Sequence, residues 1–223
     1  MFTILLNVIN AVKVTLTPEQ QYIKEHQMLF DSAIIQPDQQ WLIDKMLNKL
    51  LIGKDKYQTV SLAFNNIVPW WFILMTHAME AGGFENPFLY HLHCGDPLTA
   101  RTFHVPIGRP KFNPKSGTTP PSKLNPYTWE ESAIDALQQF KDPKETDWSV
   151  GACLWREEQY NGLGYRKYHK QVHTPYVWSF TNHYGKSPSI GKYVLDGKWD
   201  ATAISKQPGC ATFLIRLKEK GLL

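Results

Sequence analysis

The chain has 223 residues, of which 43% are hydrophobic and 20% are charged, and its formal net charge is +4. This is enough apolar material for one sizeable core or two small ones, and it argues against a disordered chain. The basic residues are scattered, without a run of five or six, so the charge does not predict a nucleic-acid-binding protein. The most apolar run, 67–75, contains Pro69 and is too short to predict a membrane span.

The N-terminal residues 1–16 do not have the pattern of a conventional signal peptide. They lack a basic start, a continuous apolar run and a small-residue cleavage site. We therefore expect an N-terminal segment over 1–16, no conventional secretion, and a single domain over 17–223. The cysteines, Cys94, Cys153 and Cys210, form no Cys-x-x-Cys pair, so either all are reduced or one bridge leaves a free thiol.

Three helix patterns occupy the first part of the chain. Thr17-Pro18-Glu19-Gln20 has an N-cap hydroxyl, a proline in the first turn and a Gln that closes a capping box. A second amphipathic pattern follows Pro37-Asp38 and ends at Gly53. The third, 69–79, is apolar on nearly all sides and precedes a double glycine, which predicts a helix in the middle of the domain.

The helical period disappears over 84–125, where Gly and Pro separate short alternating pieces. This pattern predicts a small β-element followed by a long loop. Helices resume with a capping box at Thr128 and with a second start at Thr146 or Asp147 that runs through Tyr160.

The end of the chain contains a hairpin signal and one more helix pattern. The Asp-Gly pair within 193–199 is typical of a two-residue β-turn, and 208–220 has a helical pattern. Together these elements predict an α+β protein that is mainly α-helical.

Glu80 stands at the end of the most apolar helix, one turn after Thr76 and His77. Burial there would raise the pKa of its carboxyl group, which is what a general acid needs near neutral pH. The structural alternative is a helix-end Glu that reaches water or pairs with His77.

Asp96 lies in Gly95-Asp96-Pro97, within the predicted β-element. A carboxylate from a turn, facing Glu80 across a cleft, would give the pair used in glycoside hydrolysis. Gly-Asp-Pro is also an ordinary turn sequence, so a structural role for Asp96 stays open.

Three histidines, His91, His93 and His104, lie close to Cys94 and Asp96 in sequence, and imidazole and thiolate are both zinc ligands. No second ligand pair follows at a recognised spacing, so we expect no metal site. A zinc-dependent amidase or peptidase built on these histidines remains an alternative.

Taken together, the segments resemble the lysozyme-like superfamily and, within it, the goose-type lysozymes and lytic transglycosylases. Segment 68–80 followed by Gly82-Gly83 looks like the buried helix of that family, which ends in the catalytic glutamate. Segment 158–164 is similar to the Ala-Tyr-Asn-Gly-Gly type segment of the sugar cleft, and Tyr176-Val177 and Tyr184 resemble its Tyr-Val and final Tyr.

The chain departs from this family pattern at two positions. Ala81 replaces the serine that commonly follows the family glutamate, and Gln159 replaces the alanine before Tyr-Asn. The segments 95–102 and 108–110 look like features of a phage and bacterial group of lysozymes.

The resemblance implies a lysozyme-like fold and cleavage of the β-1,4 bond between N-acetylmuramic acid and N-acetylglucosamine in peptidoglycan. Glu80 would be the general acid, and Asp96 is the candidate second carboxylate. The candidate groups for binding sugar hydroxyls and acetamides are Thr99, Thr102, Tyr160, Asn161 and Tyr184.

We expect a monomer that acts on glycan strands without a cofactor and reaches the wall by phage-type release or another export route. The alternatives are a lytic transglycosylase with the same site and a non-catalytic module that binds peptidoglycan or another carbohydrate.

Overall fold

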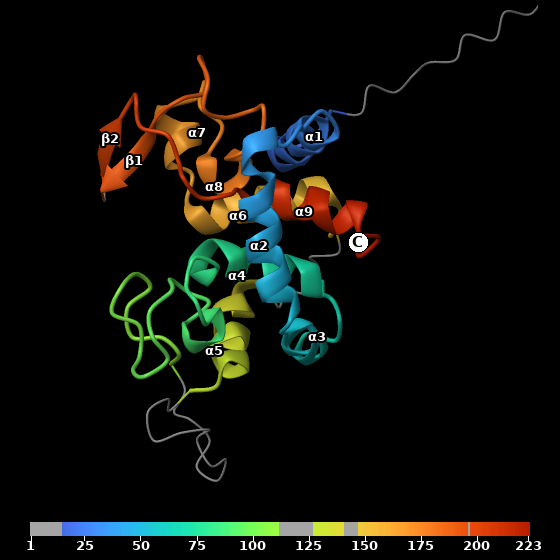
Figure 1. Ribbon diagram of the computed structural model, residues 1–223, viewed down its shortest axis with the longest axis vertical. Coiled ribbons are helices and arrows are strands. Elements are labelled where there is room, and N and C mark those ends of the chain that lie inside the picture. Colours follow the sequence, from blue (N-terminus) through green and yellow to red (C-terminus); the bar gives the residue numbers. More distant parts are fainter. Residues whose placement is uncertain (1–14, 112–126, 141–146, 196) are drawn as a thin grey trace, which may run out of the picture.

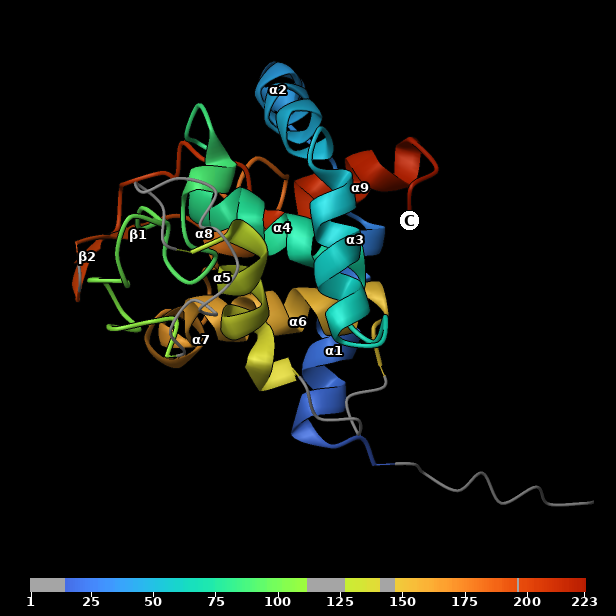
Figure 2. The same ribbon diagram turned by 90° about the horizontal axis from the view of Figure 1, so that it is seen from below.

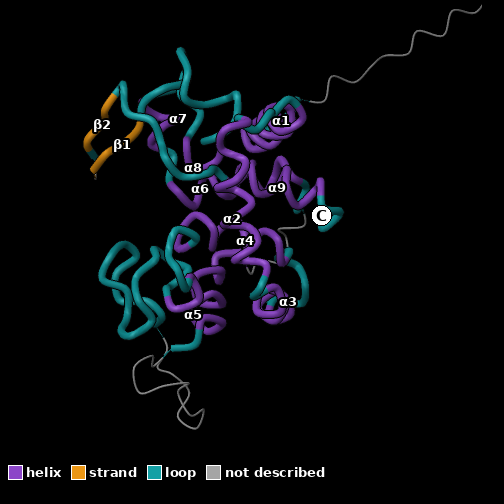
Figure 3. The backbone as a smooth tube through the Cα atoms, viewed as in Figure 1, coloured by secondary structure: helices purple, strands orange, loops and turns teal. Residues whose placement is uncertain are grey.

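The computed structural model describes residues 15–111, 127–140, 147–195 and 197–223, and these are mainly helical with one two-stranded antiparallel sheet (Figures 1 and 3). The helices are α1 (Pro18–Asp31), α2 (Gln40–Leu51), α3 (Lys54–Ala63), α4 (Trp70–Ala81), α5 (Trp129–Ala136), α6 (Val150–Asn161), α7 (Gly164–Tyr168), α8 (Pro175–Trp178) and α9 (Cys210–Glu219). The strands are β1 (Lys192–Leu195) and β2 (Lys198–Asp200). Within the ranges described, no helix has the length and apolar character needed to cross a membrane.

Side-chain caps set several helix starts where the sequence predicts them. The Thr17 hydroxyl accepts from the backbone N–H of Gln20 at 3.2 Å, and the Gln20 side chain accepts from the Thr17 backbone at 2.9 Å. The same reciprocal pair joins Thr128 and Glu131 at the start of α5. Both predicted capping boxes are therefore confirmed.

The helix prediction differs from the structure at α6 and α3, and the short helices α7 and α8 were not predicted. Helix α6 is capped by Ser149 rather than by Thr146 or Asp147, and Thr146 lies outside the described residues. Helix α3 was not predicted, because Gly53 was interpreted only as the end of α2, whereas it is also the N-cap residue of α3.

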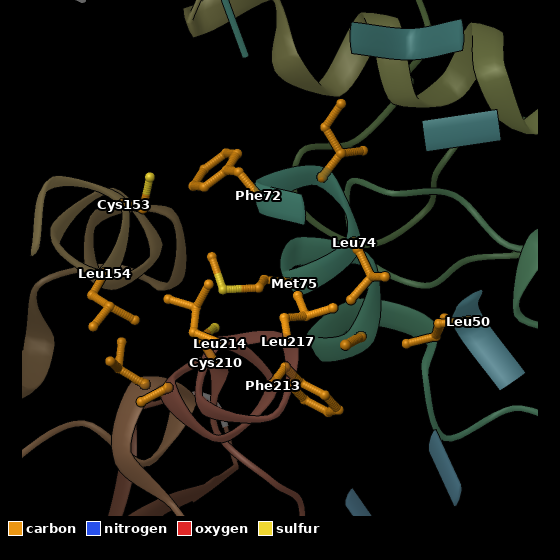
Figure 4. Close-up of a cluster of buried hydrophobic side chains, with 14 of the residues drawn as sticks. Leu50, Phe72, Leu74, Met75, Cys153, Leu154, Cys210, Phe213, Leu214 and Leu217 are labelled. Atoms are coloured by element: carbon orange, nitrogen blue, oxygen red, sulfur yellow. The ribbon is translucent and has the colours of Figure 1, made fainter. Parts of the chain in front are cut away.

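Helix α4 lies in the middle of the molecule in both ribbon views (Figures 1 and 2). Its residues from Phe72 to Ala78 are all buried, as its apolar sequence predicts. Between α4, α6 and α9, side chains such as Met75, Leu154 and Leu214 form the core (Figure 4). Each such fully buried Leu or Met contributes about 1.5–3 kcal/mol through the hydrophobic effect. This packing fixes the C-terminal end of α4, where Glu80 lies.

The β-structure lies in a different place from the one predicted over 84–125. In the described part, 84–111, Tyr90 and Pro97 form an isolated bridge, and the chain otherwise follows turns and a short 3₁₀ helix, Pro87–Leu89. The predicted β-element is therefore wrong for these residues, and 112–125 lie outside the described residues. Side-chain hydrogen bonds and glycine turns, rather than strand pairing, provide partners for many backbone N–H and C=O groups of this loop.

The hairpin predicted near the C-terminus is confirmed. Strands β1 and β2 pair antiparallel, with Tyr193 opposite Trp199, on either side of Gly197 and of Asp196, which lies outside the described residues. In both ribbon views this hairpin and the loop after α4 lie on the same side of the molecule (Figures 1 and 2). The candidate site lies on that side.

Candidate active site

Glu80 is half-buried in the last turn of α4, and its carboxyl group is held by a neighbouring phenol. The Tyr176 hydroxyl, from α8, donates to Glu80 Oε1 at 2.7 Å. His77, the alternative partner considered from the sequence, instead contacts Tyr57, with 2.8 Å between its Nδ1 and the phenol oxygen. The structure thus directs the Glu80 carboxyl toward α8 and away from His77.

The proton affinity of Glu80 suits an acid at neutral pH. Burial raises the pKa of this carboxyl to about 7, and the hydrogen bond from Tyr176 opposes part of that rise. The C-terminal end of a helix also carries partial negative charge, which disfavours an ionised carboxyl in the last turn. Near pH 7 a substantial fraction of Glu80 is therefore protonated and able to donate.

Two neighbouring pockets open beside Glu80. The first, which we call the glutamate pocket, has a volume of about 330 Å³ and is lined by Glu80, Phe84, Lys206 and other residues. The second, the hairpin pocket, has a volume of about 510 Å³ and lies between the ends of α6 and α8 and strand β1.

The two pockets share a common wall. Met79 and Gln207 line both, and the Gln207 side chain donates to the Met79 backbone carbonyl at 2.7 Å. Tyr176 also lines the hairpin pocket, so its phenol connects that pocket with the Glu80 carboxyl. A ligand in either pocket lies next to the residues around Glu80.

The backbone around Glu80 is fixed by two close contacts from other segments. Gly95 has φ +69°, and a Cβ on it would lie 2.4 Å from the Glu80 carbonyl oxygen, so this approach requires glycine. The Lys49 ammonium, from α2, donates to the Gly82 carbonyl at 2.8 Å and so satisfies a carbonyl at the end of α4. Both contacts hold the turn in which the carboxyl is placed.

A second buried carboxyl, Glu157, lies behind Glu80. It is fully buried in α6, and the Thr76 hydroxyl of α4 donates to its Oε1 at 2.7 Å. Burial raises the pKa of Glu157 to about 8, the negative charge of Glu80 raises it further, and the hydrogen bond from Thr76 opposes the rise. Glu157 is therefore mostly neutral at pH 7, and it lies close enough to Glu80 for the two carboxyls to interact electrostatically.

Glu157 was not among the residues predicted from the sequence. It lies four positions after Cys153 and three after Leu154, so the helical period places it on the buried face of α6. A glutamate on an apolar helix face is the signal that would have found it. Tyr176 entered the sequence analysis only as part of the family pattern, since nothing local indicates its contact with Glu80.

Asp96, the predicted second carboxylate, is surrounded by donors from its own loop. Its Oδ2 accepts from the backbone N–H groups of Phe103 at 2.7 Å and His104 at 2.9 Å, and its Oδ1 lies 2.6 Å from His104 Nδ1. Although burial opposes ionisation, these hydrogen bonds outweigh it and lower the pKa of Asp96. This geometry favours the turn interpretation, in which Asp96 organises the loop.

Two of the predicted sugar-binding residues are committed to internal hydrogen bonds. Thr102 is buried, and its hydroxyl donates to the Pro106 carbonyl and accepts from the Arg109 backbone at 2.9 Å. Tyr184 is also buried, and its hydroxyl donates to the Gly191 carbonyl at 3.1 Å. Their sequence positions suit a cleft, but the polar groups of both residues stabilise loops.

The other three predicted sugar-binding residues lie in different surroundings. Asn161 lines the hairpin pocket, where its side chain donates to the Thr174 hydroxyl at 3.3 Å. Tyr160 lines a third pocket, and its hydroxyl donates to the Leu92 carbonyl at 2.9 Å. Thr99 lies exposed in the loop after Asp96 and lines none of these three pockets. Of the predicted set, Glu80 and Asn161 thus line the two connected pockets.

The histidines have separate partners. His91 contacts the Ser132 hydroxyl, with 2.7 Å from Nδ1 to Oγ, and His93 Nε2 lies 2.8 Å from Asp135 Oδ2. Among the residues that the structure describes, no three His, Cys, Asp or Glu side chains are grouped so as to hold a metal ion. Cys94, Cys153 and Cys210 are all free thiols.

Comparison of the chain with family models, curated proteins and solved structures finds no match.

Proposed function

We propose that this protein is a peptidoglycan hydrolase of the lysozyme-like type, which cleaves the β-1,4 bond after N-acetylmuramic acid. The observation that carries the proposal is Glu80: a carboxyl with a pKa raised to about 7 at the end of a buried helix, open to a pocket. The position of Glu80 agrees with the catalytic position in the family that the sequence resembles. The hairpin pocket beside it offers amide and phenol groups for a sugar.

In this mechanism protonated Glu80 donates its proton to the glycosidic oxygen while the bond from that oxygen to the anomeric carbon breaks. The leaving sugar departs as an alcohol, and positive charge develops on the sugar that remains. Water adds to this carbon, and its proton returns to Glu80. General acid catalysis of this kind contributes about 10²–10⁴-fold to the rate.

A lytic transglycosylase with the same site is the second candidate, and one observation favours it. Among the described residues that line the glutamate and hairpin pockets, Glu80 is the only carboxylate. Two-carboxylate hydrolysis needs a partner for Glu80. A transglycosylase has no such need when the 6-hydroxyl of the muramic acid adds to the anomeric carbon and Glu80 accepts its proton.

The test is digestion of purified peptidoglycan with the wild-type protein and with Glu80→Gln, followed by mass spectrometry of the released muropeptides. The wild type should release products with a reducing muramic acid if it is a hydrolase and 1,6-anhydro products if it is a transglycosylase. Glu80→Gln should lose at least 100-fold in rate while keeping its melting temperature. Glu85→Gln, a change at an exposed glutamate nearby, is the matched control. No product from the wild type, or an active Glu80→Gln, would contradict the proposal.

A further inference from the structure

A third pocket, which we call the loop pocket, lies beside the end of α6 and has a volume of about 520 Å³. One wall is the loop segment 105–107, whose Val105 and Ile107 side chains are 81% and 72% exposed. The lining also includes Gln138 and Gln159, and the Gln138 amide donates one hydrogen bond to the Ile134 carbonyl at 3.1 Å. The lining therefore combines aliphatic side chains with amide groups that can donate and accept hydrogen bonds.

The aliphatic wall is held in place by hydrogen bonds at its base. Asp96 accepts from the backbone N–H groups of Phe103 and His104, and the Thr102 hydroxyl donates to the Pro106 carbonyl. The backbone N–H of Thr102 also donates to the Arg109 carbonyl at 2.8 Å. This scaffold keeps apolar side chains in solvent without support from the core, which is the arrangement expected of a preformed binding surface.

The charges in the loop pocket favour an anionic ligand. Arg109 pairs with Asp135, with 2.8 Å between Nε and Oδ2, and His93 contacts the same oxygen. Burial lowers the pKa of His93 to about 4, so this ring is neutral at pH 7. Lys111 adds a further positive charge at the exposed rim, so the lining has an excess of positive charge.

These features fit a short acidic peptide better than a sugar ring. Branched aliphatic side chains accommodate the methyl groups of alanine, and glutamine amides match the donors and acceptors of peptide bonds. A carboxylate of the peptide would face Lys111, because Arg109 is already paired with Asp135. A sugar site usually offers Trp, Tyr or Phe faces, whereas Tyr160 is the one residue of these three types among the described residues that line this pocket.

We propose that the loop pocket binds the acidic stem peptide that branches from the glycan strand, an inference that rests on the proposed function of Glu80. The pocket is placed for such a branch, because Tyr160 lines it and the next residue, Asn161, lines the hairpin pocket. A strand held beside Glu80 would thus pass close to the loop pocket. The protein then recognises glycan that carries uncleaved peptides.

The test is a binding measurement with Glu80→Gln protein, which avoids turnover, and two soluble ligands. One is a glycan oligosaccharide with its stem peptides, and the other is the same oligosaccharide after an amidase has removed them. We expect the peptides to increase affinity about tenfold, which corresponds to about 1.4 kcal/mol. Adding Lys111→Gln or Ile107→Ser should abolish this increase, because these side chains are exposed and contact the peptide in the proposal. Lys45→Gln, on α2, is the control for a lost surface charge.

The outcomes separate the two proposals. Equal affinity for both ligands, or an increase that survives Lys111→Gln and Ile107→Ser, would overturn the stem-peptide site and leave the glycosidase proposal standing. If neither oligosaccharide binds, both proposals fail. Chemical-shift changes of the Val105 and Ile107 methyl groups on adding the free peptide alone would support the site independently of any glycan.

Discussion

At the scale of single residues, the hydrogen bond from Tyr176 to Glu80 affects both the orientation and the proton affinity of the carboxyl group. This bond lowers the Glu80 pKa, so its removal should raise the pKa and move the basic limb of the pH–rate profile to higher pH. In Tyr176→Phe we also expect kcat at the optimum to fall roughly tenfold, since an unconstrained carboxyl is less well oriented. The measurement is kcat/KM from pH 4 to 9.

The control for this change is Tyr168→Phe, which alters a phenol on an exposed part of α7. It should reproduce the wild-type profile. A Tyr176→Phe protein with a lower rate but an unshifted basic limb would show that the phenol does not set the proton affinity of Glu80.

The Asp96→Asn variant tests whether Asp96 is a catalytic or a structural carboxylate. As a loop organiser it accepts from two backbone N–H groups and contacts His104, and Asn offers one acceptor oxygen fewer. We expect Asp96→Asn to lower stability by about 1–3 kcal/mol, measured by urea unfolding, with kcat per folded molecule unchanged. A lower kcat at unchanged stability would instead restore Asp96 as the catalytic partner expected from the family resemblance.

At the scale of elements, the end of α4 and the loop after it pack closely against each other at Gly95. A Cβ there would lie 2.4 Å from the Glu80 carbonyl oxygen, at a φ of +69°. Gly95→Ala should therefore destabilise the fold by about 1–3 kcal/mol and displace the Glu80 turn, which lowers kcat as well.

Gly221→Ala is the matched control for Gly95→Ala. Its φ is +66° and its added Cβ would meet nothing within 4 Å, so it has the backbone strain without the clash. Should both variants lose only the same small amount of stability and keep full activity, the contact between Gly95 and α4 would have no role in placing Glu80.

Local sequence signals predict the helices better than they predict the contacts between distant residues. The capping boxes at Thr17 and Thr128 and the apolar run of α4 act within a few residues, so the sequence alone places these helices. The loop over 84–111 depends on Asp96 and Thr102, whose partners lie up to eight positions away in no regular period. Alternating residues there indicate strands, although among the described residues no neighbouring strand pairs with them.

The same distinction applies to the candidate site. Glu80 is predictable because a carboxyl at the end of a largely apolar helix is unusual, and because one short segment of sequence shows both features. Its contact with Tyr176 joins residues 96 positions apart, and the Thr76–Glu157 bond spans 81. Such contacts are set by the packing of α4, α6 and α8, which a single sequence does not specify.

At the scale of the whole molecule, the two buried carboxyls connect stability with pH. Glu157 and Glu80 have folded-state pKa values of about 8 and about 7, both above the usual value of 4.5. The native state therefore keeps protons that the unfolded chain has lost, and its stability falls as pH rises toward 8. Buried His77 and His93, with pKa values lowered to about 3 and about 4, act in the opposite direction, and their effect fades as pH rises through 6.5, where unfolded histidine loses its charge.

Comparing Glu157→Gln with the wild type from pH 6.5 to 8.5 tests the contribution of one of these carboxyls, because the buried histidines and thiols are the same in both proteins. Gln has nearly the same shape and still accepts from Thr76, but it does not ionise. While the native state keeps the Glu157 proton, wild-type stability falls by about 1.4 kcal/mol per pH unit from this group, and the variant lacks that part of the slope. Melting temperatures measured at half-unit steps should therefore diverge with rising pH, with Glu157→Gln gaining several degrees on the wild type by pH 8.5. Parallel curves would mean that Glu157 is already ionised in the folded protein, and its buried surroundings would have to contain a compensating positive charge.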